Sequence, residues 1–171
     1  VTWGDDFSRR SDPNPTVSDI TDTLHTVKAI AAGYGHCIAL LANGTVVGWG
    51  GTPQGQTKIP TGLANVVAIA SGHDHSMALK EDGSVVAWGW NAWGQTTIPA
   101  GMTGVKSVAA HFSHTAVLKN DGTVVSFGGD AFGQLGLGRA VISATPVQAR
   151  GLTNVASISS TLHTVALKTD G

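Results

Sequence analysis

A histidine that returns at a fixed interval constrains this chain more than any other feature of its sequence. His36, His75 and His114 are 39 residues apart (36 to 75 and 75 to 114), and His163 follows after a further 49 (114 to 163). Each lies in a similar stretch, such as Gly33-Tyr-Gly-His-Cys-Ile-Ala-Leu40 in the first case. Self-similarity with a period of about 20 to 50 residues indicates a repeat architecture. The fold therefore has to be explained one unit at a time.

Each unit contains three short apolar runs separated by turn residues. In the second unit these runs are Val66–Ala70, His75–Leu79 and Ser84–Trp88. An Asn-Gly or Asp-Gly dipeptide stands between the second and third runs, at Asn43-Gly44, Asp82-Gly83, Asp121-Gly122 and Asp170-Gly171. Such a dipeptide between alternating apolar runs predicts a hairpin whose two central residues both adopt positive φ. No helical period persists, so the units predict small antiparallel sheets and not a helical solenoid.

A small sheet of this kind cannot bury both of its faces alone, but stacking such sheets around an axis buries them. The predicted fold is therefore all-β, a β-propeller of four-stranded antiparallel blades. The opening segment Val1-Thr-Trp3-Gly4 matches the third run of a unit, and the chain stops at the turn before that run. We therefore expect four blade-equivalents in one domain, one of them shared between the termini, at residues 27–65, 66–104, 105–154 and 155–171 completed by 1–26.

Three arrangements satisfy this count of blades. One chain closes on itself as a four-bladed ring, two chains exchange half-blades in an eight-bladed homodimer, or the chain forms part of a larger ring. Completion of the shared blade would remove free sheet edges, which otherwise invite aggregation.

The composition argues against several function classes. Charged residues make up 12% of the chain, and the net charge of −1 comes without a basic cluster, so we expect no nucleic-acid partner. No apolar run approaches the length of about 18 residues that a membrane span needs. The single Cys37 forms no internal disulfide and is expected to be a small buried residue. With Val at position 1 and no signal peptide, we expect a mature or trimmed chain.

The recurrent side chains are interpreted as structural. Buried imidazoles need a hydrogen-bond partner, and a partner within the same blade is expected for the four histidines His36, His75, His114 and His163. A once-per-blade aromatic slot is expected to pack between adjacent blades; it holds Trp3, Trp49, Trp88 and Phe127. The pairs His73/His75 and His111/His114 lack a third ligand other than Asp74, so no metal site is predicted. No nucleophile, paired carboxylates or phosphate loop appears, so we predict neither catalytic residues nor a cofactor.

One unit carries enough motifs to suggest a family. The stretch Leu79-Lys-x-Asp-Gly-Ser-Val-Val-Ala-Trp-Gly89, followed by Gly94-Gln95 and Ile98-Pro99, resembles the regulator of chromosome condensation repeat. It looks most like the short bacterial version found in the propeller-type beta-lactamase inhibitor. The resemblance covers residues 27–171 and 1–4, whereas residues 5–26 depart from it. It implies a β-propeller whose relatives serve as nucleotide exchange factors for a small GTPase, light sensors, enzyme inhibitors or surface modules.

Two loops per unit vary while the frame stays constant, and variable loops on a rigid scaffold are where binding usually resides. Several of them carry aromatic residues that lack the once-per-blade recurrence of a core position. The resemblance to the inhibitor implies that both loop sets gather on one ring face, which would hold Tyr34, His73, Asp74, Trp90, Trp93, Phe112, Asp130 and Phe132. Aromatic residues rimmed by a few charges are typical of a protein-binding hot spot.

The predicted function is a non-catalytic scaffold that presents these loops to a protein partner. The main alternative is a lectin-like surface module in which Trp90 and Trp93 stack on sugar rings. An enzyme inhibitor and a small-GTPase exchange factor are further alternatives. The bacterial character of the units leads us to expect a secreted or cell-surface protein.

Overall fold

The computed structural model describes residues 26–51, 53–136, 143–149, 151–160 and 163–170, and its regular elements are strands throughout. The first unit contains β1 (Val27–Ala32), β2 (His36–Leu41) and β3 (Val46–Gly50). The second contains β4 (Val66–Ser71), β5 (His75–Lys80) and β6 (Val85–Gly89). The all-β prediction is confirmed.

The later units differ from the first two in their number of strands. The third contains β7 (Val105–His111), β8 (His114–Lys119), β9 (Val124–Gly128) and β10 (Ser143–Gln148). The fourth contains β11 (Val155–Ser160) and β12 (Thr164–Lys168). The sheets are ordered β1-β2-β3, β4-β5-β6, β7-β8-β9-β10 and β11-β12, with every pairing antiparallel.

Four-stranded blades were therefore the wrong prediction for the first two units. A fourth strand needs backbone N–H groups to pair with the third strand, and the third unit has eleven residues more than the others from which to build it (50 in residues 105–154 against 39 in residues 27–65). Proline does not decide this, because β10 itself contains Pro146, between the residues where its register against β9 shifts, just as the shorter segments contain Pro60 and Pro99. Ile59 and Ile98 of these segments pack against the cores instead.

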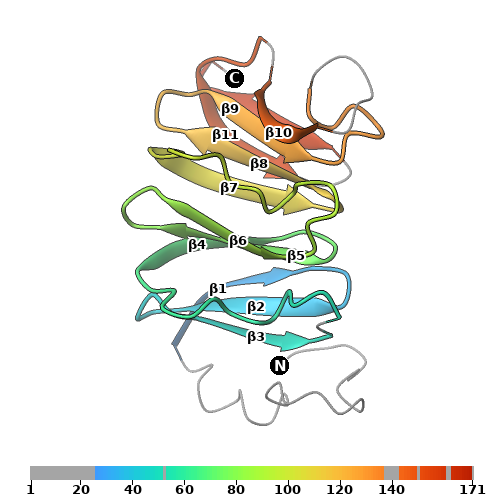
Figure 1. Cartoon of the computed structure of the whole chain (residues 1–171). Coiled ribbons are helices and arrows are strands. Elements are labelled where there is room, and N and C mark those ends of the chain that lie inside the picture. Colours follow the sequence, from blue (N-terminus) through green and yellow to red (C-terminus); the bar gives the residue numbers. More distant parts are fainter. Residues whose placement is uncertain (1–25, 52, 137–142, 150, 161–162, 171) are drawn as a thin grey trace.

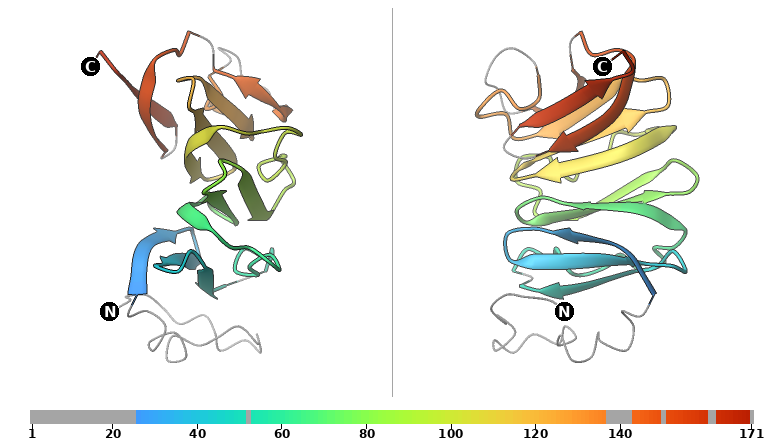
Figure 2. Two further views of the ribbon diagram at one scale, coloured as in Figure 1. Left: turned by 90° about the vertical axis from the view of Figure 1, so that its left-hand side faces the viewer. Right: turned by 180° about the vertical axis from the view of Figure 1, so that it is seen from behind.

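The sheets stack face to face along a curved path (Figures 1 and 2). The first strand of each sheet lies beside the first strand of the next, so that β1, β4, β7 and β11 follow one another along the stack. The β1–β3 sheet lies at one end of this arc and the β11–β12 sheet at the other (Figure 1). The third strand predicted from residues 1–4 lies outside the described residues.

The hairpin turns differ from the predicted two-residue type. Gly44 has a φ of 78°, whereas Asn43 before it has no positive φ. The Gly44 N–H donates to the Leu41 carbonyl and the Leu41 N–H to the Thr45 carbonyl, which closes a three-residue loop with glycine in the left-handed position. The side chain of Asn43 then accepts hydrogen bonds from the Thr45 backbone and hydroxyl. The Asx residue was thus selected for its side-chain oxygen and not for positive φ.

Apolar side chains meet between successive sheets. Ile38, Leu40 and Val46 of the first unit pack with Val66 and Trp88 of the second. Met77, Leu79 and Val85 of the second unit pack in the same way with Val117 and Phe127 of the third. The once-per-unit aromatic residue at position 88 or 127 therefore covers the face of the preceding unit. Each interface contributes its own small core, and burial of apolar surface there is the main stabilising term.

Candidate functional site

The recurrent histidines form hydrogen bonds between units. The His36 Nε2 lies 2.9 Å from the Ser76 Oγ, and the His75 Nε2 lies 3.1 Å from the Thr115 Oγ1. The His114 Nε2 repeats the contact with the Thr164 Oγ1 at 3.1 Å. The predicted partner within the same blade was therefore wrong. Each histidine reaches the residue that follows the histidine of the next unit, so it ties neighbouring sheets together.

The hydrogen bond that the accepting hydroxyl itself donates shows which nitrogen of these imidazoles carries the proton. The Ser76 hydroxyl donates to the Gln56 carbonyl at 2.9 Å, so its oxygen accepts from the His36 Nε2–H. The Nδ1 atom of His36 is buried and has no partner among the described residues. Protonation there would bury an unpaired charge, and burial lowers the pKa of His36 to about 4. The same cause lowers the pKa of His75 to about 3.

Glutamine side chains close the second loop of each unit, a role that sequence reasoning missed. The Gln56 Oε1 accepts from the Gln54 N–H, and Gln95 and Gln134 repeat this with Trp93 and Phe132. The Gln56 carbonyl also accepts from the Trp88 Nε1–H at 2.8 Å. The recurrence of Gly-Gln once per unit was the available signal. These bonds explain why loops of different sequence keep one shape.

Both variable loops of a unit lie at the same end of its sheet. The Gly51 N–H donates to the Gly35 carbonyl at 2.7 Å, which joins the two loops of the first unit. The Trp90 N–H repeats this bond with the Asp74 carbonyl in the second unit at 2.8 Å. The Asn-Gly and Asp-Gly turns lie at the opposite end of the strands, as the pairing of β2 with β3 requires. The variable loops therefore share one face of the arc, which we call the loop face.

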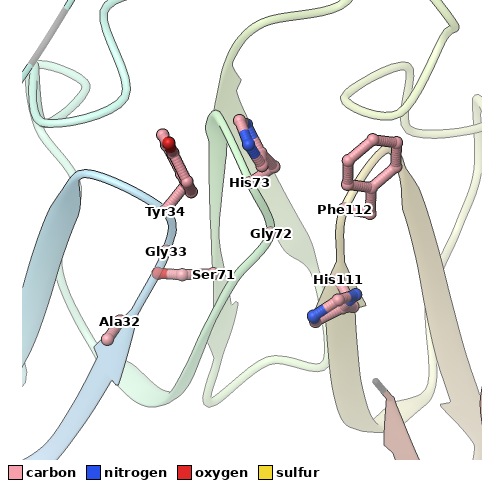
Figure 3. Close-up of a pocket in the computed structure, with 8 residues that line it drawn as sticks. All are labelled: Ala32, Gly33, Tyr34, Ser71, Gly72, His73, His111 and Phe112. Carbon is pink, nitrogen blue, oxygen red and sulfur yellow. The ribbon is translucent and has the colours of Figure 1, made fainter. Parts of the chain in front are cut away.

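Three aromatic side chains from successive units contact one another on the loop face. The Tyr34 and His73 rings stack with centroids 4.3 Å apart and planes 10° apart. Phe112 meets the other side of His73 edge-on, with centroids 5.3 Å apart. Tyr34 nevertheless remains 81% exposed. We call these three residues the aromatic row (Figure 3).

Backbone hydrogen bonds hold the aromatic row in place. The Tyr34 N–H donates to the His73 carbonyl at 3.1 Å, and the His73 N–H donates to the Phe112 carbonyl at 2.9 Å. The His73 Nδ1 also lies 2.7 Å from the Asp74 Oδ2. Asp74 accepts a second bond from the Gln56 Nε2 at 3.3 Å. The row is thus preorganised by the frame, and Asp74 serves mainly to orient His73.

Phe112 occupies a backbone conformation that a phenylalanine disfavours. Its φ is 40°, and the other described non-glycine residues with positive φ are two asparagines, Asn65 and Asn154. Asparagine tolerates the left-handed region, whereas a bulky residue there costs of order 1 kcal/mol or more. A residue keeps such a strained conformation where another role of its side chain outweighs the cost in folding free energy.

A hollow of about 280 Å³ lies beneath the aromatic row (Figure 3). The Ser71 Oγ and the His111 Nδ1 contribute to it two buried polar atoms without a hydrogen-bond partner among the described residues. The hollow is lined by Ala32, Gly33, Tyr34, Ser71, Gly72, His73, His111 and Phe112. Both polar atoms are shielded from solvent, so an incoming group would meet the walls of the hollow and not these atoms.

The remaining predicted aromatic residues lie in the second set of loops. Trp90 and Trp93 meet edge to face, with centroids 6.2 Å apart. Trp93 and Phe132 are exposed, and Trp90 is half-buried. These side chains extend the loop face beyond the aromatic row.

Asp130 does not belong to the exposed part of the loop face, so this predicted contact is wrong. Its side chain is 0% exposed, and its Oδ1 accepts from the Leu135 N–H at 2.7 Å. Asn91 fills the same role in the second unit, where its Oδ1 accepts from the Thr96 N–H at 2.9 Å. Asp130 thus shapes its loop from within and cannot reach a partner.

The described part of the chain shows neither a metal-binding cluster nor a membrane-spanning helix. Within it no cluster of three or more His, Cys, Asp or Glu side chains is arranged to hold a metal ion. In the same residues no helix has the length and hydropathy to cross a membrane.

Two of the recurrent aromatic residues remain to be placed. Trp3 lies outside the described residues. Trp49 is buried against Ala39, with Val27 and Val47 packed beside it.

Antiparallel sheets follow one another in an arc, and a histidine hydrogen bond and a packed aromatic residue join each sheet to the next. This arrangement defines a propeller built from sequence repeats. The pattern described as "Regulator of chromosome condensation (RCC1) repeat" matches residues 27–56, 66–95 and 105–134, more than half of the chain. The chain belongs to the family of proteins with this repeat. Comparison with curated proteins finds no significant match.

Solved structures of similar fold are longer than this chain. Yeast RCC1 (Prp20), solved bound to Kap60, is 25% identical with a TM-score of 0.73, over 85% of this chain and 42% of that one. Prp20p from Saccharomyces cerevisiae, reported with its binding to Gsp1p and histones, is 25% identical with a TM-score of 0.72, over 85% and 44%. Human WBSCR16, at 22% identity, has a TM-score of 0.73 over 85% and 45%. The chain therefore spans less than half the length of these relatives.

Proposed function

We propose that this protein is a non-catalytic scaffold that binds a protein partner through the loop face. The observation that carries the proposal is the aromatic row. Tyr34 and Phe112 stay exposed on either side of the half-buried His73 while the frame holds the three rings together, and exposed apolar patches of this kind mark interaction sites. Because the rings are already in place, binding costs little side-chain entropy. One relative, yeast Prp20, also engages proteins: one of its structures is bound to Kap60, and another is reported with its binding to Gsp1p and histones.

The hollow beneath the row supports a finer statement about the contact. A partner side chain that enters the hollow would lie against Tyr34, His73 and Phe112, which line it. The strain at Phe112 supports the same conclusion, since glycine would fit that backbone better. The fold alone would not require a phenylalanine there.

The test compares proteins captured by the immobilised chain with those captured by variants. Tyr34→Ala and Phe112→Gly together remove two exposed rings, while both backbone hydrogen bonds of the row remain. Glu81→Ala, an exposed change at the turn end of β5, is the matched control. We expect at least one protein to be captured specifically by the parent and the control, with a loss of about tenfold or more in the double variant. Equal capture by all three would contradict the proposal.

A carbohydrate-binding module is the alternative that the Trp90–Trp93 pair supports, because an exposed indole stacks on sugar rings. A glycan array separates the two functions. Sugar binding that disappears with Trp93→Ala and survives Tyr34→Ala would favour the lectin function. Stimulated release of nucleotide from a small GTPase would instead favour an exchange factor, and inhibition of an isolated enzyme would favour an inhibitor.

A further inference from the structure

The loop face carries a carboxylate at a position where the other units have none. Asp74 directly precedes His75, and the residues at the same position in the first and third units are Gly35 and Ser113. The second and third strands nevertheless pair in the same register in all three of these units. The frame therefore forms without a carboxylate at this position, and the role of Asp74 has to be sought in the groups that it contacts.

Asp74 lies in the middle of a series of hydrogen bonds that ends at the aromatic row. The Gln54 N–H donates to the Gln56 Oε1 at 3.0 Å, and the Gln56 Nε2 donates to the Asp74 Oδ1 at 3.3 Å. The Asp74 Oδ2 lies 2.7 Å from the His73 Nδ1. In the second unit the equivalent glutamine is present but the series stops there, since the Gln95 Nε2 has no partner among the described residues.

This series fixes which nitrogen of His73 carries the proton. A backbone N–H can only donate, so the Gln56 amide is held with its oxygen toward Gln54 and its NH2 group toward Asp74. A carboxylate accepts hydrogen bonds, so the His73 Nδ1–H donates to it. In the neutral imidazole the Nε2 atom is then a hydrogen-bond acceptor. His36 has the opposite arrangement, because its Nε2–H donates to the next unit.

The His73 ring is accessible from the loop face. Its side chain is 33% exposed, and its Nε2 makes no hydrogen bond with a described residue. The ring points the same way as that of Tyr34, away from Ser71 (Figure 3). A group that reaches the Nε2 atom therefore lies beside the exposed rings of Tyr34 and Phe112.

We infer that the partner group that meets the aromatic row is a basic side chain, lysine or arginine, which donates to the His73 Nε2. The inference rests on the function proposed above and names the chemistry of its contact. Lysine and arginine donate hydrogen bonds and accept none. Their cations are also attracted to exposed aromatic faces, here those of Tyr34 and Phe112. Asp74 places a negative charge behind His73, whereas no lysine or arginine lines the hollow.

Asp74→Asn should reverse the arrangement at almost unchanged side-chain volume. Gln56 would still offer its NH2 group, so the oxygen of the new amide would turn toward Gln56 and its NH2 group toward the His73 Nδ1. The imidazole would then accept at Nδ1 and carry its proton on Nε2. A lysine or arginine would meet a donor there instead of an acceptor.

Nuclear magnetic resonance tests the position of the proton. Long-range 1H–15N spectra of the labelled chain at about pH 8, where an ordinary imidazole is neutral, distinguish the two tautomers. We expect the Nδ1–H form for His73 in the parent and the Nε2–H form in Asp74→Asn, while His36 keeps its Nε2–H form in both. A parent with the His73 proton on Nε2, or a variant with an unchanged tautomer, would overturn the inference.

A displayed library of random peptides, selected on the immobilised chain, tests the contact itself. Peptides whose binding Tyr34→Ala weakens are those that engage the row. We expect them to carry lysine or arginine and to lose about tenfold or more in affinity for Asp74→Asn, the scale of a hydrogen bond to a charged group. Asp82→Asn removes the same charge from a turn at the opposite end of the strands, where the first unit already has Asn43, and should leave binding unchanged.

The outcomes separate this inference from the proposed function. Peptides that depend on Tyr34 but lack a basic residue, or that bind Asp74→Asn as tightly as the parent, contradict the inference and leave the proposed function standing. Selection of no peptide that depends on Tyr34 would count against the proposed function and the inference alike.

Discussion

At the residue scale, the histidine is the side chain that orders this fold. Its Nε2–H reaches the next unit and its Nδ1 has no described partner. In the first two units its ring also lies against the glycine three residues before it. Gly72 meets the His75 ring in this way, so a Cβ at position 72 would occupy space that the imidazole fills. The histidine and the glycine therefore depend on each other for packing, and the effects of mutating them on stability should not be additive.

Gly72→Ala tests that pairing. A Cβ would meet the His75 ring, and overpacking a core position costs about 1–3 kcal/mol of unfolding free energy. In the presence of His75→Ala the same change should cost much less, because the ring is gone. Urea unfolding of the two single variants and the double variant measures the coupling. Additive losses would show that the glycine serves the backbone and not the ring.

The buried histidines also predict how stability depends on pH. The pKa of His75 is lowered to about 3 and that of His114 to about 4, first by burial and then by neighbouring histidines. In the unfolded chain they titrate near 6.5, so between about pH 6.5 and 4 the unfolded state binds protons that the folded state does not.

Unfolding free energy should therefore be full above about pH 6.5 and fall as the pH is lowered, by up to ~1.4 kcal/mol per pH unit for each buried histidine. Asp82 and Asp121, whose hydrogen bonds to Ser84 and Thr123 lower their pKa to about 2, add to the loss only below about pH 4. Denaturant titrations between pH 7 and 4.5 measure the slope. A flat profile for the parent would contradict the prediction.

At the scale of elements, the third strand belongs to its own sheet and also to the core of the preceding unit. Trp88 on β6 packs on Ile38 and Leu40 of the first unit, and its Nε1–H donates to the Gln56 carbonyl. Each third strand thereby closes the core of the unit before it. The stability of one sheet therefore depends partly on a side chain of the next sheet.

Substitutions of Trp88 separate the contribution of its packing from that of its hydrogen bond. Trp88→Ala should lower the unfolding free energy by about 3–5 kcal/mol, because a large buried side chain is lost. Trp88→Phe should cost less, since the third unit already uses Phe127 in this place. Part of its cost, about 1 kcal/mol, is the lost bond to the Gln56 carbonyl. Chemical denaturation of both variants provides the measurement, and equal losses would argue that packing contributes little.

At the scale of the whole molecule, each sheet contacts its immediate neighbours, so destabilisation should spread by distance along the arc. With Trp88→Ala, amide hydrogen exchange should accelerate most in β1–β3 and β4–β6 and least in β11–β12. Exchange followed by mass spectrometry, peptide by peptide against the parent, tests this. Uniform acceleration in all four units would mean that the arc unfolds as a single block.

Much of the fold of the whole molecule, and part of its candidate site, could be predicted from the sequence. The spacing of His36, His75 and His114 and the Asp-Gly turns were enough for the number of hairpins and their stacking. The direction of the histidine bond was not predictable, because a repeated motif does not tell which neighbour holds its partner. Asp130 was misplaced for a related reason: a carboxylate in a loop looks the same in sequence whether it faces solvent or its own backbone.

Aromatic residues in the loops were easier to interpret. Tyr34, His73 and Phe112 lack the recurrence of core positions, and the structure brings them into contact on the loop face. Their order was beyond sequence reasoning, because it depends on backbone bonds between loops of different units. The hollow beneath them arises in the same way from three separate strands.

The histidine bond has a consequence for how such a chain can change over generations. Each unit carries a donor for the unit after it and an acceptor for the unit before it, as His75 and Ser76 do side by side. A duplicated stretch such as residues 66–104 would arrive with both halves of its own junction. Gene segments of one unit can therefore be added or removed without rewriting their neighbours, while the loops on each copy remain free to diverge.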